Sequence, residues 1–426
     1  MTPASHVFTP DLRRTYPVVD HARDVWLYAR DGRRWLDAAG GAMVVSIGHG
    51  VPEVLEEIRG QLERVAFVYR GQFTSEPTEA LAALLSDLAP AGFGHAFFVS
   101  GGSEATESAI KLARRYHLER GEPRRTKVLA RWQSYHGNTL GALALSGHAG
   151  RRRDYVPMLP DAGHIAPVYC YRCPFGLTYP SCRIACADDL ERAILNEGPE
   201  NVAAFIAEPI VMTLGVVGAV PGYFAKVREI CDRYGVLLIA DEVITGFWRT
   251  GPAFACETWG ALPDLITCAK GMASGYAPLG AVLVREPVVE AIRRGTGQFA
   301  HGYTYAGNPL ACAAGLATLD LYRDEALFAR AQAREPVFAE AAMGLKGLPN
   351  VLDIRVVGLA AGIDLAPVPD EPGERGYAAM EKAFHQEDLL VRVTGDTIAV
   401  SPPLIASEGE IADIFERLAR VIRAVA

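Results

Sequence analysis

The sequence predicts a three-layer α/β domain on a mostly parallel sheet, followed by a smaller α+β unit. Short apolar runs alternate with helical patterns through the middle of the chain, which is typical of parallel strands buried on both faces. After about residue 320 the apolar runs become shorter and less regularly separated by helices, which favours an α+β unit. The chain has 426 residues. A single hydrophobic core rarely grows that large, so two domains are expected.

The individual elements follow in chain order. An Asp-Gly turn within Val25–Asp37 indicates a hairpin, which we expect to pack with the C-terminal unit. Apolar runs predict strands at His95–Ser100, Lys127–Arg131, Ala203–Ala207, Val236–Ala240, Leu265–Cys268 and Ala281–Val284. Helical spacing predicts helices at Glu104–Arg120, Gly222–Tyr234 and Pro309–Arg323. The C-terminal unit is predicted to hold strands at Val351–Val357, Ala360–Leu365, Leu389–Val393 and Thr397–Val400 and a last helix at Glu408–Val425. The expected divisions are an N-terminal segment (1–55), a large domain (56–320) and a small domain (321–426).

Composition and charge are those of an ordinary globular protein. Half of the residues are apolar, 22% are charged and the net charge is −8. Arg151-Arg152-Arg153 is too short for a nucleic-acid surface, and we interpret it as a solvated or phosphate-facing loop. No apolar run reaches 18 residues, and the first residues lack the pattern of a signal peptide. We therefore expect a cytoplasmic protein with no membrane or nucleic-acid partner.

Four of the eight cysteines cluster as Cys170, Cys173, Cys182 and Cys186. Their spacing only partly fits the paired knuckles of structural zinc sites. The intervening aromatic and proline residues favour a packed loop of reduced thiols, so we assign no metal ligands. A metal or redox role of this loop stays open.

A carboxylate and a lysine 29 positions apart carry most of the chemical information. Asp241 follows the apolar run Val236–Ala240, and Lys270 lies just past the run Leu265–Cys268. The carboxyl ends of parallel strands are where open α/β sheets bind ligands. Pyridoxal phosphate (PLP) chemistry requires such a pair, because the lysine forms a Schiff base with the cofactor and the carboxylate keeps the pyridine nitrogen protonated.

Two further segments suit the same cofactor. The stretch Ser100–Ala105 contains two glycines at a predicted helix start, where backbone N–H groups favour an anion such as a phosphate. This stretch is neither of the glycine-rich nucleotide-binding motifs. Tyr135, after another predicted strand, could stack on a planar ring. Each of these signals also has an ordinary structural explanation, as a helix cap and a core aromatic.

Taken together, the motifs resemble the class III (ω-)aminotransferases, PLP enzymes of fold type I. The resemblance covers roughly residues 20 to 420, in the order of the family. It rests on Gly102-Ser103-Glu104-Ala105, Ser134-Tyr135-His136-Gly137, Ala207-Glu208-Pro209, Asp241–Phe247 with Arg249-Thr250-Gly251, Lys270-Gly271 and Thr304–Pro309.

The resemblance implies a role for each cofactor residue. Lys270 would form the internal aldimine and shuttle protons, and Asp241 would pair with the pyridine nitrogen. Val243 and Tyr135 would cover the two faces of the ring. Gly102 and Ser103 would bind the phosphate. Thr304 would reach the same phosphate from the neighbouring subunit, which implies a homodimer with shared active sites.

The resemblance also implies the substrate residues. Arg392, followed by Ser401-Pro402-Pro403-Leu404, resembles the segment that binds the carboxylate of a keto acid acceptor. Glu208 would pair with Arg392 in the empty site or contact the substrate. Met43 and Phe73 would help to shape the pocket. The loop Gly40–Val45 is small or aliphatic where many amine-accepting relatives carry Trp or Phe.

These assignments predict ping-pong transamination of an amine or ω-amino acid with a keto acid, with pyruvate as the expected acceptor. The alternatives on the same scaffold are an aminomutase, an epimerase or a decarboxylating transaminase. A PLP-binding regulator and a protein organised by zinc on the cysteine loop are the alternatives from other classes.

Overall fold

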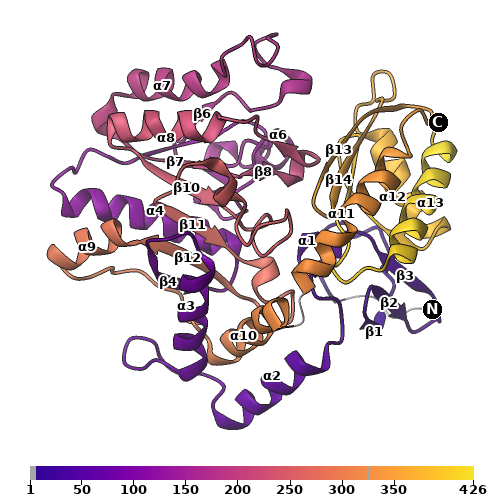
Figure 1. The fold of residues 1–426 in the computed structure, drawn as a ribbon, viewed down its shortest axis with the longest axis horizontal. Helices are drawn as coiled ribbons and strands as arrows, with labels where there is room; N and C mark the ends of the chain where they lie inside the picture. Colours follow the sequence, from indigo (N-terminus) through magenta and orange to yellow (C-terminus); the bar gives the residue numbers. More distant parts are fainter. Residues whose placement is uncertain (1–5, 325–326) are drawn as a thin grey trace.

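The computed structural model describes residues 6–324 and 327–426. The first five residues of the predicted N-terminal segment, and residues 325–326 of the predicted small domain, lie outside this part. A large α/β unit stands beside a smaller unit that holds both chain ends (Figure 1). The large unit is built on a seven-stranded sheet with the order β4 (Phe93–Val99), β12 (Gly280–Arg285), β11 (Leu265–Cys268), β10 (Leu237–Asp241), β7 (Val202–Ala207), β5 (Lys127–Arg131) and β6 (Gly163–Ile165).

The sheet is mostly parallel, as predicted. β11, β10, β7, β5 and β6 pair in parallel, whereas β12 is antiparallel to both of its neighbours, β11 and β4. A parallel return strand needs a long crossover connection. Only residues 269–279 separate β11 from β12, and they contain a short 3-10 turn, Lys270–Met272, but no crossover helix, so β12 runs back along β11.

Both faces of this sheet are covered by helices, which explains the continuous apolar runs. On β10, Leu237 and Ile239 face a core shared with α4 (Gly102–Glu119) and α9 (Glu286–Arg294). Leu238 faces the opposite core, shared with α7 (Ala185–Glu197) and α8 (Tyr223–Tyr234). Successive side chains of a strand point to opposite faces, so a strand between two helical layers must be apolar at every position.

The smaller unit contains an antiparallel sheet with the order β13 (Val351–Val357), β14 (Ala360–Leu365), β17 (Thr397–Val400) and β16 (Arg392–Thr394). Its helices are α11 (Leu327–Met343), α12 (Glu374–Gln386) and α13 (Glu408–Ala424). The predicted hairpin is present as β2 (Trp26–Ala29) and β3 (Arg34–Asp37), preceded by β1 (Val19–Arg23). β3 pairs in parallel with β15 (Leu389–Leu390) and so connects the N-terminal segment to the smaller unit.

One sequence-based strand is corrected by this arrangement. Residues Leu389–Val393 form two strands, β15 and β16, that belong to different sheets and are separated at Val391. An apolar run alone does not show where a chain leaves one sheet for another. The proposed domain boundaries near residues 55 and 320 stay predictions.

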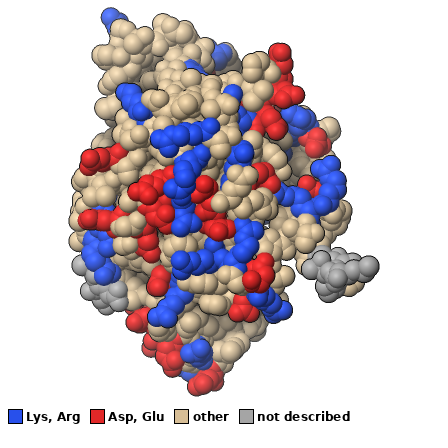
Figure 2. All heavy atoms as spheres, turned by 90° about the vertical axis from the view of Figure 1, so that its right-hand side faces the viewer, with Lys and Arg blue, Asp and Glu red and all other residues tan. Residues whose placement is uncertain are grey.

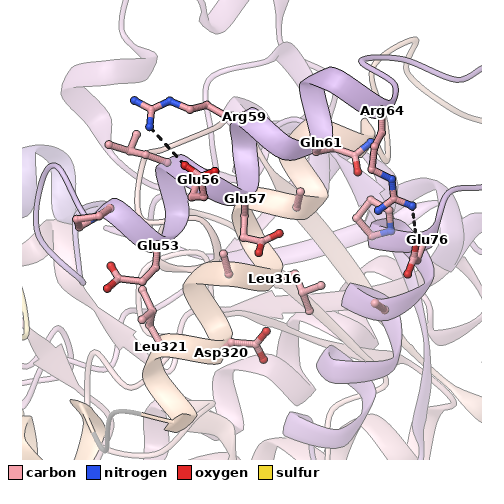
Figure 3. A pocket seen from close by; sticks show the side chains of 16 residues that line it. Glu53, Glu56, Glu57, Arg59, Gln61, Arg64, Glu76, Leu316, Asp320 and Leu321 are labelled. Atoms are coloured by element: carbon pink, nitrogen blue, oxygen red, sulfur yellow. Dashed lines mark hydrogen bonds and ion pairs between the residues drawn. The ribbon is translucent and has the colours of Figure 1, made fainter.

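Two surface features complete the description. On the face formed by the smaller unit, acidic and basic side chains are intermixed (Figure 2). Elsewhere, α2 (Pro52–Arg64), α3 (Glu76–Leu88) and α10 (Pro309–Asp324) enclose a groove with aliphatic side chains such as Leu316 and an acidic border that includes Glu53 and Glu57 (Figure 3). Within the described residues, no helix is long and apolar enough to span a membrane.

Candidate active site

Five segments of the chain meet at one edge of the seven-stranded sheet. β4, β5, β7, β10 and β11 all run in the same direction, because β12 is antiparallel to both β4 and β11. The segments that follow these strands therefore leave the sheet at the same edge, where open α/β sheets bind ligands. They carry, in chain order, Gly102 and Ser103, Tyr135 and His136, Glu208, Asp241, and Lys270.

Asp241 and Lys270 follow two adjacent parallel strands. Asp241 is the last residue of β10 and lies opposite Thr267 of β11. Lys270 follows β11 by two residues and has a left-handed backbone φ of 40°. A non-glycine residue with such a φ is uncommon and occurs preferentially at functional sites. The strand pairing thus brings the carboxylate and the amine to one place.

A cavity of about 170 Å³ lies at this edge. It is lined by every predicted cofactor residue except Thr304, namely Gly102, Ser103, Tyr135, Glu208, Asp241, Val243 and Lys270. An amine, a buried carboxylate and a helix N-terminus around one cavity are the groups that the aldehyde, the ring nitrogen and the phosphate of PLP each require. The residues present therefore fit this cofactor.

The carboxylate of Asp241 is fixed by three hydrogen bonds. The hydroxyl of Thr267 and the backbone N–H of Val243 donate to Oδ1, at 3.2 and 3.1 Å. His136 Nδ1 lies 2.6 Å from Oδ2, and both side chains are buried. An ionised carboxylate only accepts hydrogen bonds, so Nδ1 of His136 carries the proton between the two groups. The other ring nitrogen of His136 has no partner among the described residues. Asp241 is thereby held as an acceptor toward the cavity.

The sequence pattern predicted no role for His136, which directly follows Tyr135. A histidine next to an aromatic residue gives no local indication of its partner, and His136 and Asp241 are 105 positions apart. Only the parallel pairing of β5, β7 and β10 brings them together. His136 also lines the cavity, and we interpret it as a positioning residue that acts through the carboxylate of Asp241.

Lys270 has the electrostatic environment of a reactive amine. Burial lowers its pKa from 10.5 to about 8, and the charge of Asp241 opposes this effect. The positive charges of Arg392 and Arg151 lower the pKa further. Desolvation disfavours the ammonium form, so a larger fraction of the side chain is neutral and nucleophilic near neutral pH than for an ordinary lysine.

Glu208 lies beside the cavity but not in the predicted ion pair. Its Oε2 accepts a hydrogen bond from the backbone N–H of Tyr135 at 3.3 Å. Burial, together with the charge of Asp241, raises the pKa of Glu208 well above its usual range. Among the described residues, Arg392 forms no ion pair with Glu208. Glu208 is instead held against the loop that follows β5.

Gly102 and Ser103 begin α4 and form the anion-binding end of the cavity. A Cβ atom on Gly102 would lie 2.7 Å from Cγ1 of Val243, so only glycine fits this close approach. Ser103 Oγ accepts a hydrogen bond from the backbone N–H of Asn138 at 3.1 Å. The first N–H groups of a helix have no partner within the helix and favour an anion.

The structure places the other predicted site residues outside this cavity. Arg392 lies on β16 of the smaller unit, and its positive charge lowers the pKa of Lys270. Met43 is buried in a small apolar cluster with Met212. Phe73 is 64% exposed, and Thr304 is exposed as well. Within one chain, these last three residues do not line the cavity.

The run Arg151-Arg152-Arg153, predicted as a solvated or phosphate-facing loop, has two exposed members, Arg151 and Arg153. The guanidinium carbon of Arg151 lies 4.7 Å from the ring centroid of Tyr135, which lines the cavity. The side chain of Arg152 donates hydrogen bonds to the carbonyls of Ala144 and Ser146. Only Arg153 is an exposed side chain with no such contact. A run of three arginines does not reveal which one turns toward a site.

Arg249 connects two segments that are far apart in the sequence. This fully buried guanidinium donates to the carbonyl of Pro402, the carbonyl of Val45 and the hydroxyl of Ser46. Burial lowers its pKa to about 10. Arg249 thereby ties the aliphatic loop Gly40–Val45 to the segment that follows β17.

The four clustered cysteines all line one small cavity together with aromatic side chains such as Phe175. All four are free thiols, and burial raises the pKa of Cys186 to about 11. No group of three or more His, Cys, Asp or Glu side chains in residues 6–324 and 327–426 is arranged to hold a metal ion.

Comparison with known proteins identifies the family. The model of the class-III aminotransferases matches residues 8–422. The chain belongs to the class-III aminotransferases. This aminotransferase is 37% identical over 427 residues to the omega-aminotransferase of Caulobacter vibrioides, with 97% of this chain and 96% of that protein covered.

It is also 35% identical to the putrescine–pyruvate aminotransferase of Pseudomonas aeruginosa, over 93% of this chain and 88% of that protein. A solved (S)-enantioselective omega-transaminase from Thermomicrobium roseum matches with a TM-score of 0.93 at 36% identity, over 99% of this chain and 96% of the other. The family and its α/β fold type I architecture are thus confirmed, and the protein is a PLP-dependent transaminase.

Proposed function

We propose that this aminotransferase transfers an amino group from an amine or ω-amino acid to a keto acid, pyruvate in particular, in a ping-pong reaction through Lys270. The observation that carries the proposal is the placement of Lys270, Asp241 and the N-terminus of α4 around one cavity, with Arg392 close enough to act on the charge of Lys270. A relative described as a putrescine–pyruvate aminotransferase supports pyruvate as the acceptor.

The chain's own residues would supply binding, orientation and proton transfer. Bound PLP provides an electron sink for the carbon next to the amino group. Asp241 would hold a proton at the pyridine nitrogen, and His136 would keep Asp241 in place. Lys270 Nζ, with its lowered pKa, would bind the cofactor and then move the proton at the reacting carbon. Arg392 would bind the carboxylate of the keto acid.

We also propose a homodimer in which Thr304 completes the phosphate site of the partner subunit. Support comes from the exposed position of Thr304, which does not line the cavity of its own chain. Large apolar side chains are exposed nearby: Tyr305 is 66% exposed and contacts Phe67 edge to face. An apolar surface of this kind is typical of a protein–protein interface. We expect the wild type to have the mass of a dimer in solution. The Tyr305→Glu variant should lose both the dimer and its retention of PLP.

The test of the proposed activity is a grid of amines against keto acids with purified, PLP-loaded protein. We expect amine consumption that requires a keto acid, with the Lys270→Ala variant inactive and without the visible band of the bound cofactor. Asp241→Asn should retain cofactor but lose most of the turnover rate. Racemisation or rearrangement of an amino acid without any keto acid would instead support an epimerase or an aminomutase, and would overturn the proposal.

A further inference from the structure

The cysteine loop (residues 169–184), which precedes α7, has no part in the proposed reaction, yet two of its side chains reach the smaller unit. The hydroxyl of Tyr169 is buried and donates a hydrogen bond at 3.1 Å to Oδ2 of Asp364, on β14. Arg172, from the same loop, pairs with this carboxylate oxygen at 3.6 Å. Asp364 is only 1% exposed, so a buried carboxylate of the smaller unit receives two side chains from the large unit.

Asp364 is also the centre of a polar network within the smaller unit. The guanidinium of Arg355, on β13, donates to both carboxylate oxygens, at 3.2 and 2.8 Å. The hydroxyl of Thr397, on β17, donates to Oδ1 at 2.5 Å. Burial by itself raises the pKa of Asp364, but the hydrogen bonds from Arg355 and Thr397 bring it below its usual value. Asp364 is therefore an anion at neutral pH, and an anion binds hydroxyl and guanidinium donors strongly.

Arg355 makes a contact in the opposite direction, from the smaller unit to the large one. Its Nε donates a hydrogen bond at 2.8 Å to the carbonyl of Gly215. Gly215 lies in the hairpin formed by β8 (Ile210–Val211) and β9 (Val217–Gly218), on the side of the large unit that faces β13 and β14 (Figure 1). The ring of Tyr169 packs against apolar side chains of this hairpin. The contacts thus form a closed ring that crosses between the units twice.

Two kinds of surface lie next to this ring of contacts. Met212 and Val216 of the large unit pack with Ala360 and Ala399 of the smaller unit. Beside Arg172, in contrast, a cavity of about 550 Å³ is lined by side chains of both units. Dispersion attraction is lost across such a gap, so the polar contacts of the ring carry part of the connection between the units.

The ring of contacts lies close to Arg392 in the strand register. Asp364 lies opposite Thr397 in the pairing of β14 with β17. Arg392 lies opposite Ala399 of the same strand, β17. The three strands are hydrogen-bonded to one another, so a contact that holds Asp364 against the large unit also holds β16. On the other side of the ring, the β8–β9 hairpin carries Ile210, which lines the cofactor cavity.

We propose that the cysteine loop is one half of a latch between the two units, and that this latch positions Arg392 relative to the cofactor cavity. The latch consists of Tyr169, Arg172, Gly215, Arg355 and Asp364. Tyr169 is its principal positioning residue, because its hydroxyl is buried, whereas the side chain of Arg172 is 56% exposed and its ion pair is screened by solvent. The inference rests on the proposed role of Arg392 as the group that binds the carboxylate of the keto acid.

Tyr169→Phe removes one hydrogen bond between the units and little else. The ring can keep its packing on the hairpin, and Asp364 keeps its donors Arg355 and Thr397. Tyr171→Phe is the matched control. Tyr171 lies in the same loop, is 48% exposed, and its hydroxyl forms no hydrogen bond within residues 6–324 and 327–426.

Hydrogen–deuterium exchange of the PLP-loaded protein tests the latch without any substrate. The backbone amides of residues 210–218 should exchange several-fold faster in Tyr169→Phe than in the wild type, because local opening of the hairpin costs less once the bond is gone. Tyr171→Phe should exchange like the wild type. Unchanged exchange in Tyr169→Phe, or the same increase in Tyr171→Phe, would overturn the latch.

Steady-state kinetics tests the positioning of Arg392. In Tyr169→Phe the KM for the keto acid should rise about three- to tenfold with kcat nearly unchanged, because Arg392 is correctly placed for a smaller fraction of the time. In the Arg392→Leu background, Tyr169→Phe should have no further effect on this KM, since the latch acts through Arg392. A residue that only stabilised the fold would have the same effect in both backgrounds.

Two kinetic results would overturn this positioning role. They are faster exchange in Tyr169→Phe with an unchanged KM, and an equal rise of KM in the presence and absence of Arg392. If no amine and keto acid pair is turned over, the proposed function fails, while the exchange measurement still decides whether Tyr169 joins the two units.

Discussion

The pKa of Lys270 gives the sharpest quantitative prediction. Burial lowers it from 10.5 to about 8. At pH 7 about one lysine in ten is then neutral, against about one in three thousand for an ordinary lysine, which is an enrichment of roughly 300-fold. The rate at which cofactor-free protein combines with PLP depends on the neutral amine. It should therefore rise tenfold per pH unit up to about pH 8 and level off above it.

The assay is the growth of the visible cofactor band after mixing, between pH 6 and pH 10.5, with Lys270→Ala as the control for reaction at other lysines. Two variants should move the midpoint of this pH–rate profile in opposite directions. Asp241→Asn removes a charge that raises the pKa of Lys270, so the midpoint should fall. Arg392→Leu removes a charge that lowers this pKa, so the midpoint should rise. A wild-type rate that keeps rising to pH 10, or equal shifts in both variants, would refute the electrostatic argument.

Two further predictions concern the groups around the cofactor. His136→Phe removes the hydrogen bond to Asp241 and should lower turnover by about 10- to 100-fold. His136→Asn can place an N–H near the position of Nδ1 and should recover much of this loss, which a merely structural role would not explain. Gly102→Ala puts a Cβ atom 2.7 Å from Val243 and should weaken PLP retention, measured by dialysis and absorbance. Gly101→Ala, where no atom lies within 4 Å, is its control, and equal loss in both variants would contradict the close-approach argument.

The sequence by itself predicted six of the seven strands of the large sheet, all but β6, and indicated Asp241 and Lys270 as the candidate reactive pair. The run Val236–Ala240 is apolar at every position because β10 is buried between two helical layers, and such a run has few other structural solutions. Asp241 and Lys270 then follow directly, because polar residues placed just past buried strands must lie at the ligand-binding edge of the sheet. These inferences depend only on residues that are close together in the sequence, so they need no knowledge of tertiary contacts.

Only the tertiary structure decided which distant side chains act on that pair. His136 contacts Asp241 across two intervening strand pairings, and Arg151 emerges from a run of three arginines whose members look alike in sequence. Glu208 bonds the backbone of Tyr135 rather than Arg392. Each of these contacts depends on the direction in which a loop leaves the sheet and on what else competes for the same partner. Local residue patterns do not show which partner wins this competition. The charges and hydrogen bonds that set the pKa of Lys270 are therefore known only from the folded structure.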